Sequence, residues 1–249
     1  MKIIALGDIH GRNSWQQIIQ DNDDNDLIII EGDYFDSRDK ISAAEQMYNF
    51  KEIIAFKEAN MDKVILLIGN HCEHYFPWVD SVYSGYQHKH ALEIQQLLVD
   101  ALDKGFLQMC YIHGKFLFSH AGVTKTWANY VLGRNDFKLE DGKLLEQLIN
   151  DQFKNQPMLF HFSYGNRFSF DPSGDDIFQS PIWVRPKSLM KDKLDNFIMI
   201  VGHTSMKKLD VTGIQYGVIF TDCLGTSGEY LKIDDQTDEL TVGKVDINQ

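Results

Sequence analysis

Three short runs of apolar residues in the first third of the chain alternate with segments that read as helices. The runs cover residues 2–6, 26–30 and 63–68, and the predicted helices between them cover residues 14–20 and 41–60. Continuous apolar strands separated by helices are typical of a parallel sheet that is buried on both faces. The pattern therefore predicts a βαβαβ unit.

The second half of the chain has a different pattern. Helices are predicted over 87–104, 124–132 and 140–153, and strands on both sides of His113-Gly114 and near 197–201, 216–221, 229–233 and 239–245. The late strands have no helices between them, which favours a second sheet that is antiparallel or mixed.

Residues 154–186 break this alternation. Four of the five prolines lie there, among many aromatic residues such as Phe160, Phe168 and Trp183. Long loops in compact domains are usually functional or disordered, and the aromatic content argues against disorder. Two interpretations stay open: a packed cover over a sheet edge, or a wall that faces a substrate.

Each of the first three apolar runs ends in glycine followed by a polar residue. These residues are Asp8, Asp33 and Asn70. Open α/β sheets bind ligands at the carboxyl ends of their strands, so the three side chains should converge on one rim.

Histidines extend this set. His10 lies two residues after Asp8, so both side chains can point the same way and hold one ion. His120 and His203 each follow a later apolar run. Asp33 has two carboxylate oxygens and can bridge two ions. Nitrogen and oxygen ligands without thiolate favour Mn, Fe, Zn or Mg.

Composition narrows the class of protein. The 249 residues carry 24 Lys and Arg against 36 Asp and Glu, a formal charge of -12, which disfavours nucleic acid as a partner. The N-terminus is a poor signal peptide, and no apolar run is long enough for a membrane helix. Three widely spaced cysteines indicate no disulfide framework, so a cytoplasmic location is expected.

Five short motifs carry a family resemblance. They are GDIHG (7–11), GDYFD (32–36), GNH (69–71), SHAG (119–122) and GHT (202–204). In this order they resemble the motifs of the calcineurin-like metallophosphoesterases. The resemblance implies an α/β fold: one domain over residues 1–249, built as a four-layer sandwich of two mixed β-sheets flanked by helices. It places a dinuclear metal site at the carboxyl ends of the strands.

The resemblance also implies roles for the motif residues. One metal ion would be held by Asp8, His10 and Asp33, and the other by Asp33, Asn70, His120 and His203. Two divalent ions, with Mn favoured, would be the cofactors. His71 would be the general acid, and Asp36 would orient it.

The GHT motif points to one branch of the family. Many diesterase branches carry a second histidine two residues later, where this chain has Ser205. The motifs are more similar to those of the Ser/Thr protein phosphatases and symmetrical diadenosine tetraphosphatases, which use arginines on phosphate. The candidates are Arg38 and Arg185.

Two departures affect the residues around the metal ligands. Ser37 separates Arg38 from the preceding aspartate of the motif, and Cys72 follows His71 where an acidic residue is usual. Arg12 could either reach phosphate or pair with a surface acid, and we favour the pairing.

The resulting prediction is an enzyme that hydrolyses phosphomonoesters, on phosphoprotein or small molecules, by attack of a metal-bound hydroxide. The alternatives are a hydrolase of dinucleoside polyphosphates, a phosphodiesterase, and a non-catalytic metal-binding scaffold. A complete set of ligands and an acid disfavour the scaffold. The expected partner is a phosphorylated substrate, with no membrane.

Overall fold

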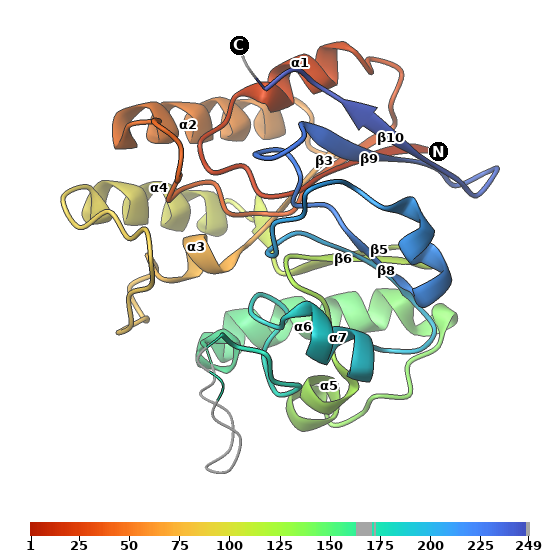
Figure 1. Cartoon of the computed structure of the whole chain (residues 1–249). Coiled ribbons are helices and arrows are strands. Elements are labelled where there is room, and N and C mark those ends of the chain that lie inside the picture. The colour runs from red at the N-terminus through yellow and green to blue at the C-terminus, as the bar shows by residue number, and fades with distance from the viewer. Residues whose placement is uncertain (163–170, 172, 248–249) are drawn as a thin grey trace.

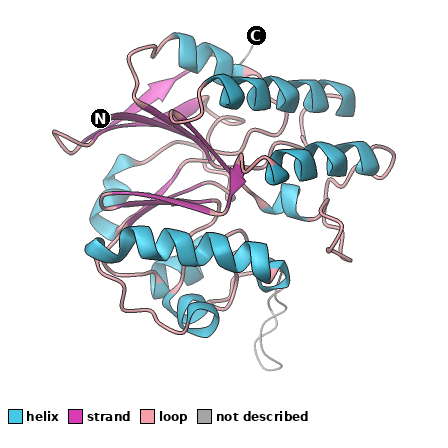
Figure 2. Ribbon diagram, turned by 180° about the vertical axis from the view of Figure 1, so that it is seen from behind, coloured by secondary structure: helices cyan, strands magenta, loops and turns pink. Residues whose placement is uncertain are grey.

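The computed structural model describes residues 1–162, 171 and 173–247. Two β-sheets lie face to face, and helices cover the outer face of each (Figures 1 and 2). Both sheets are mixed, so the predicted α/β sandwich of two mixed sheets flanked by helices is confirmed.

The first sheet has six strands in the order β10-β9-β1-β2-β3-β4. Their bounds are β1 (Lys2–Leu6), β2 (Leu27–Ile30), β3 (Val64–Leu67), β4 (Leu107–Gln108), β9 (Glu229–Asp234) and β10 (Glu239–Lys244). Strands β1 to β4 pair in parallel, as the sequence predicts for the first three, and β9 and β10 add an antiparallel edge.

The second sheet has four strands in the order β5-β6-β7-β8. Their bounds are β5 (Cys110–His113), β6 (Phe116–Ser119), β7 (Ile198–Val201) and β8 (Val218–Phe220). The first pair is a hairpin around Gly114, and the other pairs are parallel. Parallel strands β6, β7 and β8 therefore also send their carboxyl ends to one edge.

The helices are α1 (Ser14–Gln20), α2 (Ala43–Ala59), α3 (Asn70–Glu73), α4 (Ala91–Asp103), α5 (Lys125–Leu132), α6 (Gly142–Asn155) and α7 (Pro186–Asp192), with 3-10 turns η1 (Leu139–Asp141), η2 (Pro157–Phe160) and η3 (Val211–Tyr216). Helices α1, α2 and α4 lie on the side of the first sheet, and α5, α6 and α7 on the side of the second (Figure 1).

Alternation along β1 explains why the sheets stack. Ile3 and Ala5 belong to the apolar cluster between the sheets, together with Phe118 and Ile200 of the second sheet. The residues that alternate with them along the strand, such as Leu6, belong to the cluster beneath the helices. Successive strand residues point to opposite faces, so an apolar run without alternation buries both faces.

The late strands do not all join the second sheet, so that expectation is wrong for two of them. β9 pairs with β1, and β10 pairs with β9. The sequence pattern gives the strands but not their partners, because pairing over more than 200 residues is decided by tertiary packing. The first strand predicted before His113-Gly114 divides into β4 and β5, which belong to different sheets, and the short helices α3 and α7 are not predicted.

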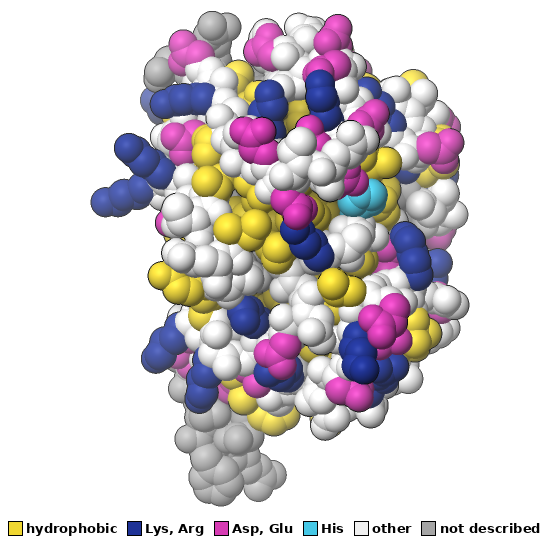
Figure 3. Space-filling model, turned by 90° about the vertical axis from the view of Figure 1, so that its right-hand side faces the viewer, with side chains coloured by type: hydrophobic (Ala, Val, Ile, Leu, Met, Phe, Trp, Pro, Cys, Tyr) yellow, Lys and Arg dark blue, Asp and Glu magenta, His cyan; other side chains and the backbone are white. Residues whose placement is uncertain are grey.

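The surface has mixed charge on the face shown in Figure 3, where acidic and basic side chains are interspersed. Among the described residues, no helix combines the length and apolar character needed to span a bilayer. The three cysteines, Cys72, Cys110 and Cys223, are buried free thiols.

Candidate metal centre

The loops that follow β1 and β2 run side by side beyond the ends of the strands. The backbone N–H of His10 donates to the carbonyl of Asp33 at 2.6 Å, and the N–H of Gly11 donates to the carbonyl of Tyr34 at 2.9 Å. These bonds continue the parallel ladder of the sheet. They bring Asp8 and His10 next to Asp33, as the strand-end argument predicts.

Two buried carboxylates are held by backbone N–H groups from other loops. Asp8 Oδ1 accepts from the N–H of His203 at 2.8 Å, and Asp33 Oδ1 accepts from the N–H of His71 at 2.8 Å. Each carboxylate thus uses one oxygen to tie two loops together. The second oxygen of Asp33, Oδ2, is buried and has no hydrogen-bond partner.

Three histidine rings are anchored in the same way. Backbone carbonyls lie against one ring nitrogen of each: Phe35 O is 2.6 Å from His10 Nδ1, Glu31 O is 2.7 Å from His120 Nδ1, and Trp183 O is 3.2 Å from His203 Nε2. A ring nitrogen beside a carbonyl carries the proton, which leaves the lone pair on the other nitrogen. Each ring is therefore fixed in a tautomer that can ligate a metal.

The free ring nitrogens meet around Asp33 and Asn70. His120 Nε2 lies 3.3 Å from Asp33 Oδ2, and His10 Nε2 lies 3.9 Å from the same oxygen. Asn70 Oδ1 is 2.9 Å from both His120 Nε2 and His203 Nδ1. The structure thus brings together all six residues that the sequence nominates as ligands, and the unpartnered Asp33 Oδ2 fits a cation among them.

The electrostatics of this cluster favour a bound cation. Burial lowers the pKa of His120, but Asp33 and Asp8 outweigh burial and raise it to about 9. Burial also acts to raise the pKa of Asp33, yet His120, His71 and His10 hold it well below its usual range. Asp33 thus keeps its charge in a buried place, where a metal ion can neutralise it.

Several residues of the site have strained backbone conformations. Among the described residues, five that are not glycine have positive φ, and four of them are site candidates: His10 at 45°, Asp33 at 49°, Asp36 at 60° and His203 at 63°. Such conformations cost about 1–3 kcal/mol each and persist where the surrounding structure imposes them.

Two glycines leave room for the carboxylates. A Cβ on Gly69 would overlap Asp33 Oδ1, and a Cβ on Gly202 would overlap Asp8 Oδ1. Both glycines directly precede a candidate ligand. Close approach of a ligand side chain, rather than a turn, explains why these positions need glycine.

Gly69→Ala is therefore expected to displace Asp33 and to weaken metal binding by at least ~10-fold. Bound metal per chain after equilibration with Mn²⁺ measures this. Gly105→Ala is the control, because a Cβ there meets no atom within 4 Å and costs only backbone strain. Equal metal content in both variants would contradict the steric explanation.

His71 and Asp36 form a hydrogen-bonded pair beside the cluster. His71 Nδ1 lies 2.9 Å from Asp36 Oδ2, and the His71 ring packs edge-on against the His10 ring at 5.2 Å. Burial acts to raise the pKa of Asp36, but His71 and His74, with the Tyr75 hydroxyl, lower it to about 2. Asp36 is therefore a carboxylate, and its Oδ2 holds the Nδ1 side of the His71 ring.

Arg185 lies at the edge of the cluster. Its guanidinium donates to the carbonyl of His203 at 3.3 Å, the Thr204 hydroxyl at 3.2 Å and the carbonyl of Ser173 at 3.1 Å. Burial lowers the pKa of Arg185, and the charge of Arg38 lowers it further, whereas Asp8 and Asp33 act to raise it. Arg185 is thus near enough to Asp8, Asp33 and the exposed Arg38 for their charges to act on it.

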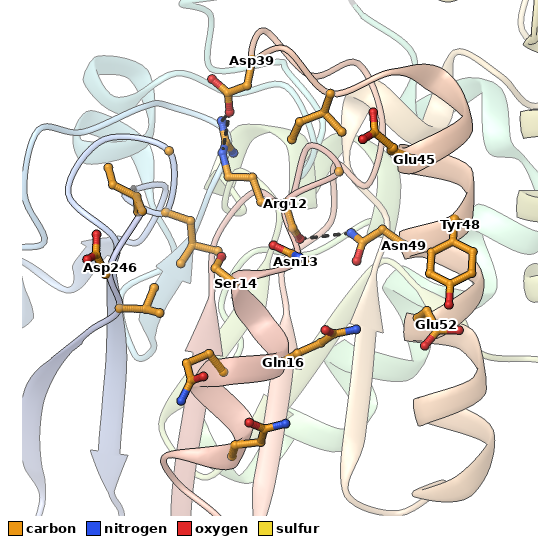
Figure 4. Close-up of a pocket in the computed structure, with 18 of the residues that line it drawn as sticks. Arg12, Asn13, Ser14, Gln16, Asp39, Glu45, Tyr48, Asn49, Glu52 and Asp246 are labelled. Atoms are coloured by element: carbon orange, nitrogen blue, oxygen red, sulfur yellow. Dashed lines mark hydrogen bonds and ion pairs between the residues drawn. The ribbon is translucent and has the colours of Figure 1, made fainter. Parts of the chain in front are cut away.

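Arg12 donates to the backbone carbonyls of Asp8 and Ile9 at 3.4 Å, and its charged partner lies outside the cluster. It forms an ion pair with Asp39, with an N–O distance of 2.8 Å, in a groove between α1, α2 and residues 244–247 (Figure 4). None of the six candidate ligands lines this groove. The interpretation of Arg12 as the partner of a surface acid is thus favoured by the geometry.

The segment 154–186 takes part in the site through the residues that are described. Trp183 supplies the carbonyl for His203, and Arg185 follows it. Phe160 is fully buried, so the segment also packs as a cover. Phe168 and the other residues of 163–170 lie outside the described residues.

Sequence reasoning missed two buried acids near the cluster. Burial and the charge of Asp8 raise the pKa of Asp222 to about 7. Glu31 is fully buried and accepts a hydrogen bond from Thr221. A signal for Asp222 exists, because it follows the apolar run of β8 as Asp8 follows β1.

Comparison with known proteins identifies a family. The sequence model of the calcineurin-like phosphoesterases matches residues 1–207. No curated protein sequence matches the chain. Among solved structures, a cold-active protein-tyrosine phosphatase from a Shewanella species has a TM-score of 0.58 at 17% identity, covering 98% of this chain and 77% of its own. A protein serine/threonine phosphatase from Saccharomyces cerevisiae also has a TM-score of 0.58, at 13% identity, covering 100% of this chain and 81% of its own. At sequence identities this low, the two similarities show a shared fold alone.

Proposed function

The chain belongs to the calcineurin-like phosphoesterase family and is a phosphoric ester hydrolase, and we propose that it hydrolyses phosphomonoesters at a dinuclear metal centre. One observation carries the proposal. Three histidine rings are fixed by the carbonyls of Phe35, Glu31 and Trp183, so that their free nitrogens meet Asp33 or Asn70.

The ligands divide between two divalent ions. Asp8, His10 and Asp33 would hold the first ion, and Asp33, Asn70, His120 and His203 the second. The unpartnered Oδ2 of Asp33 supports its role as the bridge. When bound, the ions supply Lewis acidity and neutralise charge on the phosphate, and oxygen and nitrogen donors suit Mn²⁺.

His71 would supply the proton for the leaving group. In hydrolysis, a water oxygen forms a bond to phosphorus and releases one proton to solvent, while the bond to the ester oxygen breaks. The departing oxygen takes the proton from His71 Nε2. The hydrogen bond of 2.9 Å to Asp36 holds the opposite nitrogen, so Nε2 is the ring atom that can reach the substrate.

Arg185 and Arg38 would bind the phosphate oxygens. Arg185 is already held by His203, Thr204 and Ser173, so little side-chain freedom is lost when it binds phosphate. A monoester is a dianion near neutral pH, and two guanidinium groups beside the ions suit that charge. The two solved structures described above are both of protein phosphatases, in agreement with a monoester substrate.

The test is a comparison of initial rates on p-nitrophenyl phosphate and bis(p-nitrophenyl) phosphate with Mn²⁺-loaded protein. We expect faster turnover of the monoester. Faster turnover of the diester would overturn the monoester assignment in favour of a phosphodiesterase. No turnover of either ester by protein with bound metal would overturn the catalytic proposal.

A further inference from the structure

The carboxylate of Asp36 is surrounded by four donor groups. Oδ2 lies 2.9 Å from His71 Nδ1 and 2.6 Å from His74 Nε2. Oδ1 lies 2.5 Å from the Tyr75 hydroxyl and 3.3 Å from Gln87 Nε2. A carboxylate offers about four lone-pair positions, so this one is fully used. Only the contact with His71 leads to the proposed site of reaction.

His74 is held in one orientation by its surroundings. Its Nδ1 accepts from the backbone N–H of Tyr83 at 3.3 Å, so the ring proton lies on Nε2, facing Asp36. The Nε2–H meets Oδ2 as a short ion-pair contact that is off the ideal hydrogen-bond line. Edge-on packing against Tyr75 at 4.6 Å and Tyr86 at 5.0 Å fixes the ring plane. The His74 side chain is 0% exposed, so the contact is shielded from solvent.

Tyr75 links the carboxylate to the loop before α4. Its hydroxyl donates to Asp36 and accepts from the backbone N–H of Gln87 at 2.8 Å. The same loop packs Gly85 against Asp36, where a Cβ would lie 2.9 Å from the Asp36 Cβ. The loop therefore closes over Asp36, and Tyr75 is the buried connection between them.

We propose that His74 and Tyr75 are positioning residues that hold Asp36 so that its Oδ2 fixes the ring of His71. Among the described contacts, neither side chain bonds to a candidate metal ligand, so both act through Asp36. This inference rests on the proposed role of His71 as the general acid. Without these two donors the carboxylate can rotate about its Cβ–Cγ bond, and the His71 ring turns with it.

Asp36, His71 and His74 are also close enough together to hold a cation. The donor geometry argues for the positioning role. Both oxygens of Asp36 already accept from proton donors, and Nδ1 of His74 is used by Tyr83. Asp33 Oδ2, in contrast with the oxygens of Asp36, accepts no hydrogen bond. A proton donor and a metal ion cannot share one lone pair, so the cation belongs at Asp33.

The test compares His74→Leu and His74→Gln on phenyl phosphate and p-nitrophenyl phosphate. The amide N–H of glutamine lies near the position of imidazole Nε2 and can restore the donor, whereas leucine fills the space without one. A poor leaving group such as phenolate needs the acid more than p-nitrophenolate does. We expect His74→Leu to lose about 10-fold more activity on phenyl phosphate than on p-nitrophenyl phosphate, with unchanged bound metal. His74→Gln should recover most of this difference.

Tyr75→Phe removes one oxygen atom and keeps the ring. It therefore tests the positioning role even if His74→Leu does not fold. It should show the same preference for the better leaving group. His71→Ala is measured alongside as the reference. Suppose that His71→Ala discriminates between the two esters, whereas His74→Leu and Tyr75→Phe lose activity equally on both. The positioning role is then overturned, and the role of His71 as the acid stands. If His71→Ala itself shows no difference between the esters, the proposed function fails at its acid, and the inference fails with it.

Discussion

Asp33→Asn is expected to lower kcat/KM by about 10³-fold or more, the largest effect of any single change considered. The proposed bridge relies on the anionic Oδ2 of Asp33, and an asparagine that keeps its oxygen toward the N–H of His71 places there an N–H₂ group that repels a cation. Metal ions contribute several kcal/mol to stabilising the transition state, and each 1.36 kcal/mol is about tenfold in rate. The substitution keeps the size of the side chain and an acceptor for the N–H of His71.

Bound metal and activity are measured together on the same Asp33→Asn sample. Asp136→Asn is the matched control, because Asp136 is an exposed partner of Arg134 and should retain both metal and rate. Two ions bound with a normal rate in Asp33→Asn would show that Asp33 is not the bridge.

His71→Ala is expected to lower kcat by about 10²–10⁴-fold while metal content stays near normal. His71 loses its contact with Asp36, but none of the six candidate ligands is removed. The loss should grow as the leaving group becomes a stronger base, because the departing oxygen then depends more on a proton. Rates on phenyl phosphate and p-nitrophenyl phosphate, with metal analysis of the same sample, measure both effects.

His113→Ala is the control for that measurement. His113 pairs with Asp235 at 2.6 Å, away from the metal cluster, and its loss should leave kcat unchanged. Unchanged turnover in His71→Ala would remove His71 from the mechanism. Loss of metal in His71→Ala would show that the residue supports the centre itself.

Much of the candidate site could be predicted because it follows a local rule. The first three parallel strands are each followed by glycine and a polar residue, and parallel strands send those ends to one edge. Asp8, Asp33 and Asn70 therefore meet as expected from the residues alone. The roles of His71 and Asp36 came from the family resemblance, and the structure adds the hydrogen bond that joins them.

Other features depend on contacts that no local pattern encodes. β9 pairs with β1, which lies more than 200 residues away in the sequence. The backbone carbonyls that fix His10, His120 and His203 are invisible in a sequence, since every residue has one. His74 could be noticed only by its distance from His71, and its contact with Asp36 depends on the loop at Tyr83.

The most direct test of the dinuclear centre is anomalous diffraction at the Mn absorption edge, from crystals of protein loaded with Mn²⁺. We expect two anomalous peaks per chain that share Asp33, one next to Asp8 and His10 and the other next to Asn70, His120 and His203. A single peak, or a peak between Asp36 and His74, would contradict the centre proposed for this enzyme.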